Sequence, residues 1–203
     1  WLGWRFALLN FLVLGFFFSW MFTGFAQLFI LERFPSMTPK KAAGIISAIY
    51  ITPIAAAPFV GSFVDRFGNR CTLGFLAFVC LVTAHILLTF THLPPLISIL
   101  ILGASFSLEQ SAIPPSVPLV VGKGSVGPAF GLLSFSCNLG AFVSPLLFGH
   151  LKDRTGTDLY GELIIIGLSG LMLIGVVVLY VTDRKWFQSQ LQLKTSKAQQ
   201  TSF

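Results

Sequence analysis

Gly61-Ser62-Phe63-Val64-Asp65-Arg66-Phe67-Gly68 follows the pattern G-x-x-x-D-R-x-G and closes a long apolar run. The pattern returns 88 residues later, also at the end of an apolar run, as Gly149-His150-Leu151-Lys152-Asp153-Arg154-Thr155-Gly156. About 88 residues is the length of three membrane helices with their connections, because each crossing needs about 20 residues. The spacing therefore predicts two three-helix units that carry the pattern at corresponding positions.

The composition excludes a soluble domain. Hydrophobic residues make up 55% of the 203 positions and charged residues only 10%, whereas soluble domains carry about 25% charged residues. The net charge of +6 does not indicate a nucleic-acid partner, because the basic residues lie at the ends of apolar runs. Three cysteines without C-x-x-C spacing predict neither a disulfide framework nor a metal site, and no cofactor is expected.

The fold class predicted is an all-α polytopic membrane protein with six transmembrane helices. The six expected spans are 6–31, 42–64, 71–91, 95–121, 126–150 and 161–182. The polar stretch 183–203 is rich in Gln, Ser, Thr and Lys, which predicts a disordered tail. Because the chain starts at Trp1 and no signal-peptide pattern follows, we expect that it begins inside a longer protein.

Charges between the spans predict the orientation. An even number of spans places both ends of the chain on one side, with eight basic residues there and five on the other side. Basic residues accumulate on the cytoplasmic side, so the termini, the tail and the first copy of the pattern are predicted to be cytoplasmic. Three spans per unit place the second copy on the opposite face. The two units would then be inverted repeats.

With Asn69 and Arg70 added, the first copy resembles the loop signature of the major facilitator superfamily, G-x-x-x-D-R-x-G-R/K-R/K. Asn69 replaces one basic residue of that signature. Residues 127–145 of the fifth span are similar to a Gly- and Pro-rich helix of the same fold. The resemblance implies that the chain is the C-terminal six-helix half of a twelve-helix transporter, and that its partner is a missing N-terminal half.

Within the superfamily, the chain resembles the lysosomal dipeptide transporters. The matching stretches are 85–91, 103–108, 117–121, 129–131 and 138–140. This resemblance implies small peptides as substrates, an integral lysosomal membrane protein, lipid as its surroundings and a glycosylated lumenal accessory subunit. The chain itself contains no N-x-S/T acceptor for glycosylation.

The resemblance also implies a gate. Asp65 would pair across the cytoplasmic helix ends and hold that side closed, while Arg66 and Arg70 would contact helix carbonyls or anionic lipid headgroups. Gly61 and Gly68 permit close helix approach and a tight turn, because neither carries a Cβ. The alternative is a solvated turn whose charges only fix the topology. The second copy supplies Gly149, Asp153, Arg154 and Gly156 as the corresponding residues.

Two ionisable residues within the spans are candidates for chemistry. Glu109 is the one carboxylate placed well inside a predicted span, where a charge costs at least about 2.5–3.5 kcal/mol on insertion scales. It is a candidate for binding a substrate ammonium or a proton; alternatively, it is a neutral acid bonded to Gln110 or to a neighbouring helix. His85 is a candidate proton relay because imidazole changes charge between pH 5 and 8, or a histidine bonded to a neighbour.

Other polar residues of the spans are candidates to line a substrate cavity. Together with Glu109 they are Gln27, Tyr50, Ser107, Gln110, Ser134 and Asn138. Prolines are expected to bend the second span at Pro53 and Pro58, and to interrupt the fourth span at 114–118, as in helices that line transport sites or as passive kinks.

The function predicted is transport of small solutes by alternating access, with uniport and proton coupling both open. Two rival functions remain: proton-coupled transport of small organic anions, and a membrane receptor or scaffold without transport. An enzyme is not expected, because the spans show no nucleophile-plus-base pattern and no cluster of histidines and carboxylates.

Overall fold

The computed structural model describes residues 3–187 and 189–193, and within these residues it contains helices and no strand. Six helical segments are long and apolar enough to cross a membrane. They are Trp4–Gly24, Pro39–Phe67, Arg70–Phe90, Pro95–Val120, Lys123–Thr155 and Leu159–Trp186. The predicted class, an all-helical membrane protein with six spans, is confirmed.

The first predicted span, 6–31, is divided in the structure. Its parts are α1 (Trp4–Trp20), the 3-10 turn η1 (Met21–Gly24) and α2 (Ala26–Arg33). Gly24 stands at the break, where a residue of low helix propensity is expected. The long helices that follow are α3 (Pro39–Phe67), α4 (Arg70–Phe90), α7 (Val126–Thr155) and α8 (Leu159–Trp186).

Prolines divide the fourth span, as predicted. Helix α5 (Pro95–Ala112) ends just before Pro114 and Pro115, since a proline lacks the N–H group and clashes with the preceding turn. The chain continues as η2 (Pro114–Ser116), the short α6 (Val117–Val120) and η3 (Lys123–Ser125). Helix α3 remains helical through Pro53 and Pro58.

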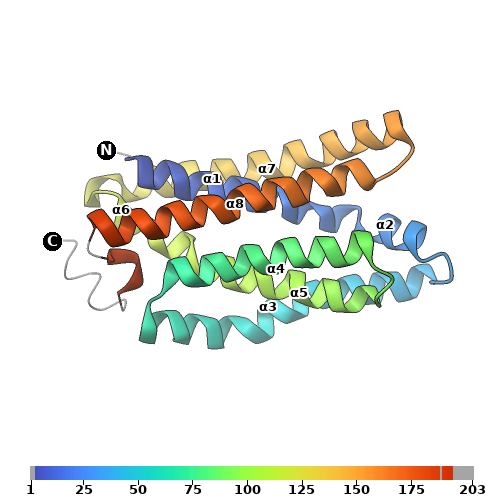
Figure 1. The fold of residues 1–203 in the computed structure, drawn as a ribbon, viewed down its shortest axis with the longest axis horizontal. Coiled ribbons are helices and arrows are strands. Elements are labelled where there is room, and N and C mark those ends of the chain that lie inside the picture. The colour runs from blue at the N-terminus through green and yellow to red at the C-terminus, as the bar shows by residue number, and fades with distance from the viewer. Residues whose placement is uncertain (1–2, 188, 194–203) are drawn as a thin grey trace.

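The contacts between helices reflect the two three-helix units. The second helix of the first unit, α3, packs on α5, and the second helix of the second unit, α7, packs on α1. The last helices of the two units, α4 and α8, pack against each other. Exchanging corresponding helices preserves this pattern, as expected for inverted repeats. In Figure 1, α4 and α8 lie on the near side, between α7 at the upper edge and α3 at the lower edge.

The two ends of the bundle carry the two copies of the sequence pattern. The start of α1, the α3–α4 connection and the end of α8 lie together at one end, at the left in Figure 1. We call this the signature end; it holds Arg5, Gly68–Arg70 and Asp183. The α7–α8 connection lies at the opposite end with α2, and we call that the repeat end. It holds Glu32, Gly156 and Asp158.

The C-terminal stretch differs from the prediction. The polar stretch from residue 183 was expected to be disordered, but α8 continues to Trp186 and η4 (Gln190–Gln192) forms a short turn. Leu191 is fully buried, which explains why this part of the stretch is ordered despite its polar composition. Residues 194–203 of the predicted tail lie outside the described residues.

Candidate functional site

The eighth residue of each pattern copy ends a helix. Gly68 follows α3 with φ +74°, and Gly156 follows α7 with φ +71°. Positive φ favours glycine because a Cβ is crowded there. The expected tight turn at Gly68 is therefore confirmed. Gly61 differs from expectation, because a Cβ built there would meet nothing within 4 Å, so no close approach requires a glycine.

The C-terminal turn η4 packs against the first pattern copy. The Asn69 N–H donates to the Gln192 carbonyl at 3.3 Å, and Arg70 Nη1 donates to the Leu193 carbonyl at 3.2 Å. A Cβ on Gly68 would collide with these two carbonyls. The turn at Gly68 thus leaves no room for a Cβ, and η4 packs directly against the loop between α3 and α4.

The charged residues of the first copy have different surroundings. Asp65 and Arg66 are exposed at the end of α3, while Arg70 is 3% exposed. The Asp65 carboxylate acts electrostatically on the Arg70 guanidinium. The gating role of Asp65 remains a prediction.

A buried ion pair closes the signature end between α1 and α8. Arg5 Nη2 donates to Asp183 Oδ1 at 2.7 Å, and the Asp183 side chain is fully buried. The second Asp183 oxygen accepts the Leu191 N–H at 3.0 Å. The Arg5 guanidinium also lies 3.9 Å from the centre of the Phe187 ring, a cation–π contact. The pair therefore joins both terminal helices to η4.

At the repeat end, one lysine of the second copy bridges two carboxylates. Lys152 Nζ lies 2.6 Å from Asp158 Oδ2 and 3.0 Å from Glu32 Oε2. Asp153 and Arg154, the aspartate and arginine of the pattern, are exposed. The bridge connects α7, the start of α8 and α2.

The structure brings His85 together with Glu162. His85 Nδ1 lies 2.8 Å from Glu162 Oε2, and both side chains are 1% exposed. Thr89, one turn further along α4, donates its hydroxyl to the same oxygen at 3.2 Å. His85 lies five residues before the end of α4, nearer the repeat end than the middle position expected. The histidine is bonded to a neighbour, and that neighbour is an ionisable carboxyl group.

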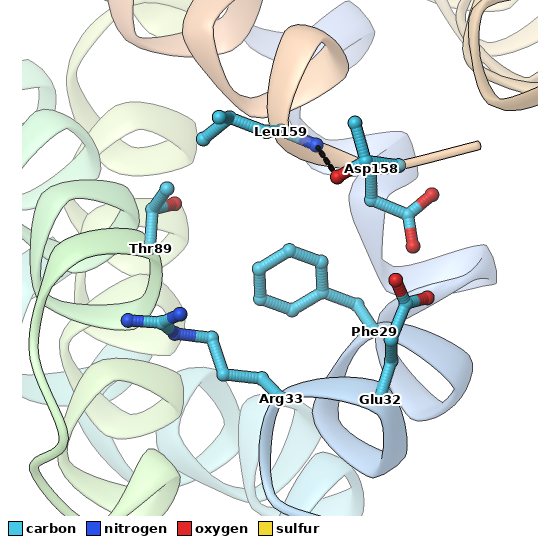
Figure 2. A pocket seen from close by; sticks show the side chains of 7 residues that line it. Phe29, Glu32, Arg33, Thr89, Asp158 and Leu159 are labelled. Carbon is cyan, nitrogen blue, oxygen red and sulfur yellow. Dashed lines mark hydrogen bonds between the residues drawn. The ribbon is translucent and has the colours of Figure 1, made fainter. Parts of the chain in front are cut away.

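A cavity of about 250 Å³ opens beside this pair. Figure 2 shows Phe29, Glu32 and Arg33 of α2 facing Thr89 of α4 and Asp158 before α8. Arg33 donates to the Leu88 carbonyl at 3.2 Å and to the Thr91 carbonyl at 3.4 Å, which fixes α2 on the end of α4. Thr89 both lines the cavity and bonds Glu162, so it connects the cavity to the buried pair.

Glu109 is fully buried near the end of α5. Its Oε2 accepts from the Gln110 side chain at 2.8 Å, and its Oε1 has no hydrogen-bond partner among the described residues. This is the bond foreseen in the structural alternative, and it leaves one oxygen available to a proton or a ligand.

The other cavity candidates are spread over several elements. Tyr50 of α3 is 54% exposed and lies edge-on to Trp20, and Asn138 of α7 is exposed and bonds the Ser134 carbonyl. Ser107 is buried and bonds the Gly103 carbonyl within α5, while Gln27 bonds the Pro39 carbonyl at the repeat end. The hydrogen bonds of Gln27, Ser107 and Asn138 go to nearby backbone carbonyls, and the assignment of these candidates to a substrate cavity stays a prediction.

Comparison with known proteins decides the family. The family model of the Major Facilitator Superfamily matches residues 6–198. The chain belongs to the major facilitator superfamily. Its six membrane-length helices correspond to half of the twelve-helix fold of that superfamily.

The curated relatives carry a more specific name. The lysosomal dipeptide transporter MFSD1 of Danio rerio is 35% identical over 162 residues, and that of Homo sapiens is 31% identical over 163 residues. Each match covers 80% of this chain and 35% of the relative. The Mus musculus protein is 32% identical over the same shares. The chain thus spans about a third of the length of these relatives.

Sequence reasoning missed Glu162 as the partner of His85 and Asp183 as the partner of Arg5. Glu162 lies at the very start of the predicted span 161–182 and was counted with the preceding connection, yet it is the fourth residue of α8 and buried. Two features of the sequence could have indicated this pair. An apolar run begins directly after Glu162, and the predicted span 71–91 contains a single histidine, His85. Pairing of this kind is the expected solution for ionisable residues in membrane helices.

Proposed function

We propose that the chain is the C-terminal half of a facilitator that moves dipeptides across the lysosomal membrane by alternating access. The substrate and the location follow the name of the relatives, which share 31–35% identity with most of this chain. The predicted N-terminal half would supply the rest of the transport path. A glycosylated accessory subunit on the lumenal face remains part of this proposal.

The observation that carries the proposal is a pair of sparsely buried helices with polar residues near their middle. In an apolar stretch of 18 residues within the segment of α3, only 6% of the residues are buried, and in the corresponding stretch of the α7 segment 22% are buried. Tyr50 on α3 and Asn138 on α7 are exposed there. The Asn138 amide donates one N–H to the Ser134 carbonyl. Its remaining N–H and its carbonyl oxygen would lack partners in the hydrocarbon, so Asn138 favours a surface that meets a polar cavity or another protein segment.

Alternating access also requires that the transport path can close at either end of the bundle. The two pattern copies lie at opposite ends of the bundle, each at the end of one of these sparsely buried helices. Asp65 with Arg70 would stabilise closure at the signature end, which we predict to be cytoplasmic. Rocking of the two halves around a fixed central site would then expose the substrate to one side at a time.

The proposal is tested by dipeptide counterflow in liposomes that contain the intact protein. We expect labelled dipeptide to accumulate against unlabelled dipeptide inside, and Asp65→Asn to slow this exchange by roughly tenfold, equivalent to about 1.4 kcal/mol. Asp153→Asn is the matched change in the second copy.

Each rival function predicts a different result. A preference for small organic anions over neutral dipeptides, with flux that requires a proton gradient, would support the anion transporter. Absence of flux for both classes, together with indifference to Asp65→Asn, would support a receptor or scaffold and overturn the proposal.

A further inference from the structure

The buried pair of His85 and Glu162 lies outside the expected transport surface. It joins α4 to α8, which pack against each other, and it involves neither α3 nor α7, the sparsely buried helices assigned to that surface. Both side chains are 1% exposed. Two polar atoms, His85 Nε2 and Glu162 Oε1, have no hydrogen-bond partner among the described residues. A buried ionisable pair with remaining donor and acceptor capacity points to a ligand that is small enough to enter.

We propose that His85 and Glu162 form a proton-binding site that is reached through Thr89 from the cavity at the repeat end. Proton binding at this pair is an additional property of the chain and does not depend on dipeptide transport.

The net charge of the buried pair is the physical reason why it should bind a proton. A neutral imidazole beside a carboxylate carries one negative charge, and burying an uncompensated charge is costly. One proton shared between His85 Nδ1 and Glu162 Oε2, 2.8 Å apart, makes the pair neutral overall. Phe22, whose ring lies 5.2 Å from that of His85 in an edge-on arrangement, supplies no competing charge.

The neighbouring charged groups are already paired with one another or with the backbone. Lys152 bonds Glu32 and Asp158, and Arg33 bonds carbonyls of α4. Other ionisable residues at the same end are exposed: Lys40, Lys41, His92, His150, Asp153, Arg154 and Tyr160. Glu162 therefore receives its side-chain hydrogen bonds from His85 and Thr89 alone among the described residues.

Thr89 provides the route from the cavity. Its hydroxyl donates to Glu162 Oε2 at 3.2 Å, and its side chain lines the cavity together with Glu32, Arg33 and Asp158. As the Thr89 oxygen takes a proton from a hydronium ion in the cavity, its own proton passes to Glu162. The hydroxyl is regenerated, and the pair gains one proton.

The proton site predicts the sign of the pH dependence of stability. The proposal requires that the folded pair holds a proton that the free imidazole of the unfolded chain loses above about pH 6.5. The folded state then binds more protons, so stability falls as the pH rises above this value. For a chain of this size, one proton corresponds to a drop in the unfolding midpoint of about 3–5 °C per pH unit.

The experiment measures the midpoint of thermal unfolding of the intact protein in detergent between pH 6 and pH 8.5. We expect Glu162→Gln to reduce the wild-type slope by this one-proton contribution, because an amide cannot hold the proton with His85, whereas the contribution of the buried Glu109 is the same in both proteins. Asp153→Asn, an exposed carboxylate at the same end, is the matched control and should keep the wild-type slope. A wild-type slope in Glu162→Gln would overturn the proposal.

Two further measurements complete the test. The first applies if Glu162→Gln fails to fold, and the second tests access to the pair from the cavity. His85→Gln removes the other half of the pair and must reduce the slope by the same amount. In a variant without Cys71, Cys80 and Cys137, Thr89→Cys must react with a water-soluble thiol reagent, and an introduced thiol that does not react would refute access from the cavity. Neither readout requires a substrate, so a failure of the proton site is distinguishable from a failure of the proposed transport function.

Discussion

At the scale of single residues, Arg5 and Asp183 depend on each other more than on any neighbour. The Asp183 side chain is fully buried, and its two oxygens are bonded to Arg5 and to the Leu191 N–H. A buried charge that loses its counter-charge is strongly destabilising, whereas replacing both charges with apolar groups is often tolerated. Removal of one charge should therefore destabilise the protein strongly, whereas replacement of both charges should destabilise it much less.

Asp183→Ala should destabilise the protein by about 3–5 kcal/mol, because the Arg5 guanidinium would remain buried without a counter-charge. The double substitution Arg5→Met with Asp183→Leu should recover most of this loss. Thermal unfolding in detergent, followed by tryptophan fluorescence, measures both effects. If the double variant is no more stable than Asp183→Ala, the loss comes from the Leu191 hydrogen bond and not from the unpaired charge.

At the scale of helices and turns, the two glycines that end α3 and α7 occupy similar φ but different surroundings. A Cβ on Gly68 would collide with the Gln192 and Leu193 carbonyls, whereas a Cβ on Gly156 would meet nothing within 4 Å. The ψ angles also differ: Gly156 is left-handed helical with ψ 8°, and Gly68 has ψ −114°. Gly68 is thus constrained by both its backbone and the C-terminal turn.

Gly156→Ala should destabilise the protein by only about 1–2 kcal/mol, the cost of a left-handed residue with a Cβ. Gly68→Ala should cost more and should displace η4, which exposes the Leu191 amide. Hydrogen exchange of that amide measures the displacement, with Gly156→Ala as the control. Unchanged protection of Leu191 in Gly68→Ala would show that the turn does not depend on this contact.

Much of this architecture was predictable from local sequence. Runs of about 20 apolar residues predicted the six spans, and Pro114 and Pro115 predicted the end of α5. The His85–Glu162 and Arg5–Asp183 pairs were not predictable, because their partners are 77 and 178 residues apart in the chain. The order of η4 was missed for the same reason: burial of Leu191 against distant helix ends outweighs a polar local composition.

At the scale of the whole molecule, the exposed surface of the bundle must divide between lipid and protein. Ile174 on α8 is 62% exposed and belongs to an apolar helix on the near side in Figure 1. Tyr50 and Asn138 are also exposed, but they are polar and lie on α3 and α7. Our proposal assigns the surface around Ile174 to lipid and the surface around Tyr50 and Asn138 to the cavity with the N-terminal half.

Lipid-phase labelling distinguishes these surfaces. In a variant without Cys71, Cys80 and Cys137, a cysteine in place of Ile174 should react with a lipid-soluble thiol reagent. A cysteine in place of Asn138 should be protected from that reagent and should react instead with a water-soluble one, because a cavity between two halves excludes lipid but admits water. Mass spectrometry of the labelled peptides gives the ratio of the two reactions at each position. Equal lipid-phase labelling at both positions would mean that α7 faces the bilayer, and the exposed amide of Asn138 would then need a partner within its own helix, where it already bonds the Ser134 carbonyl at 2.7 Å.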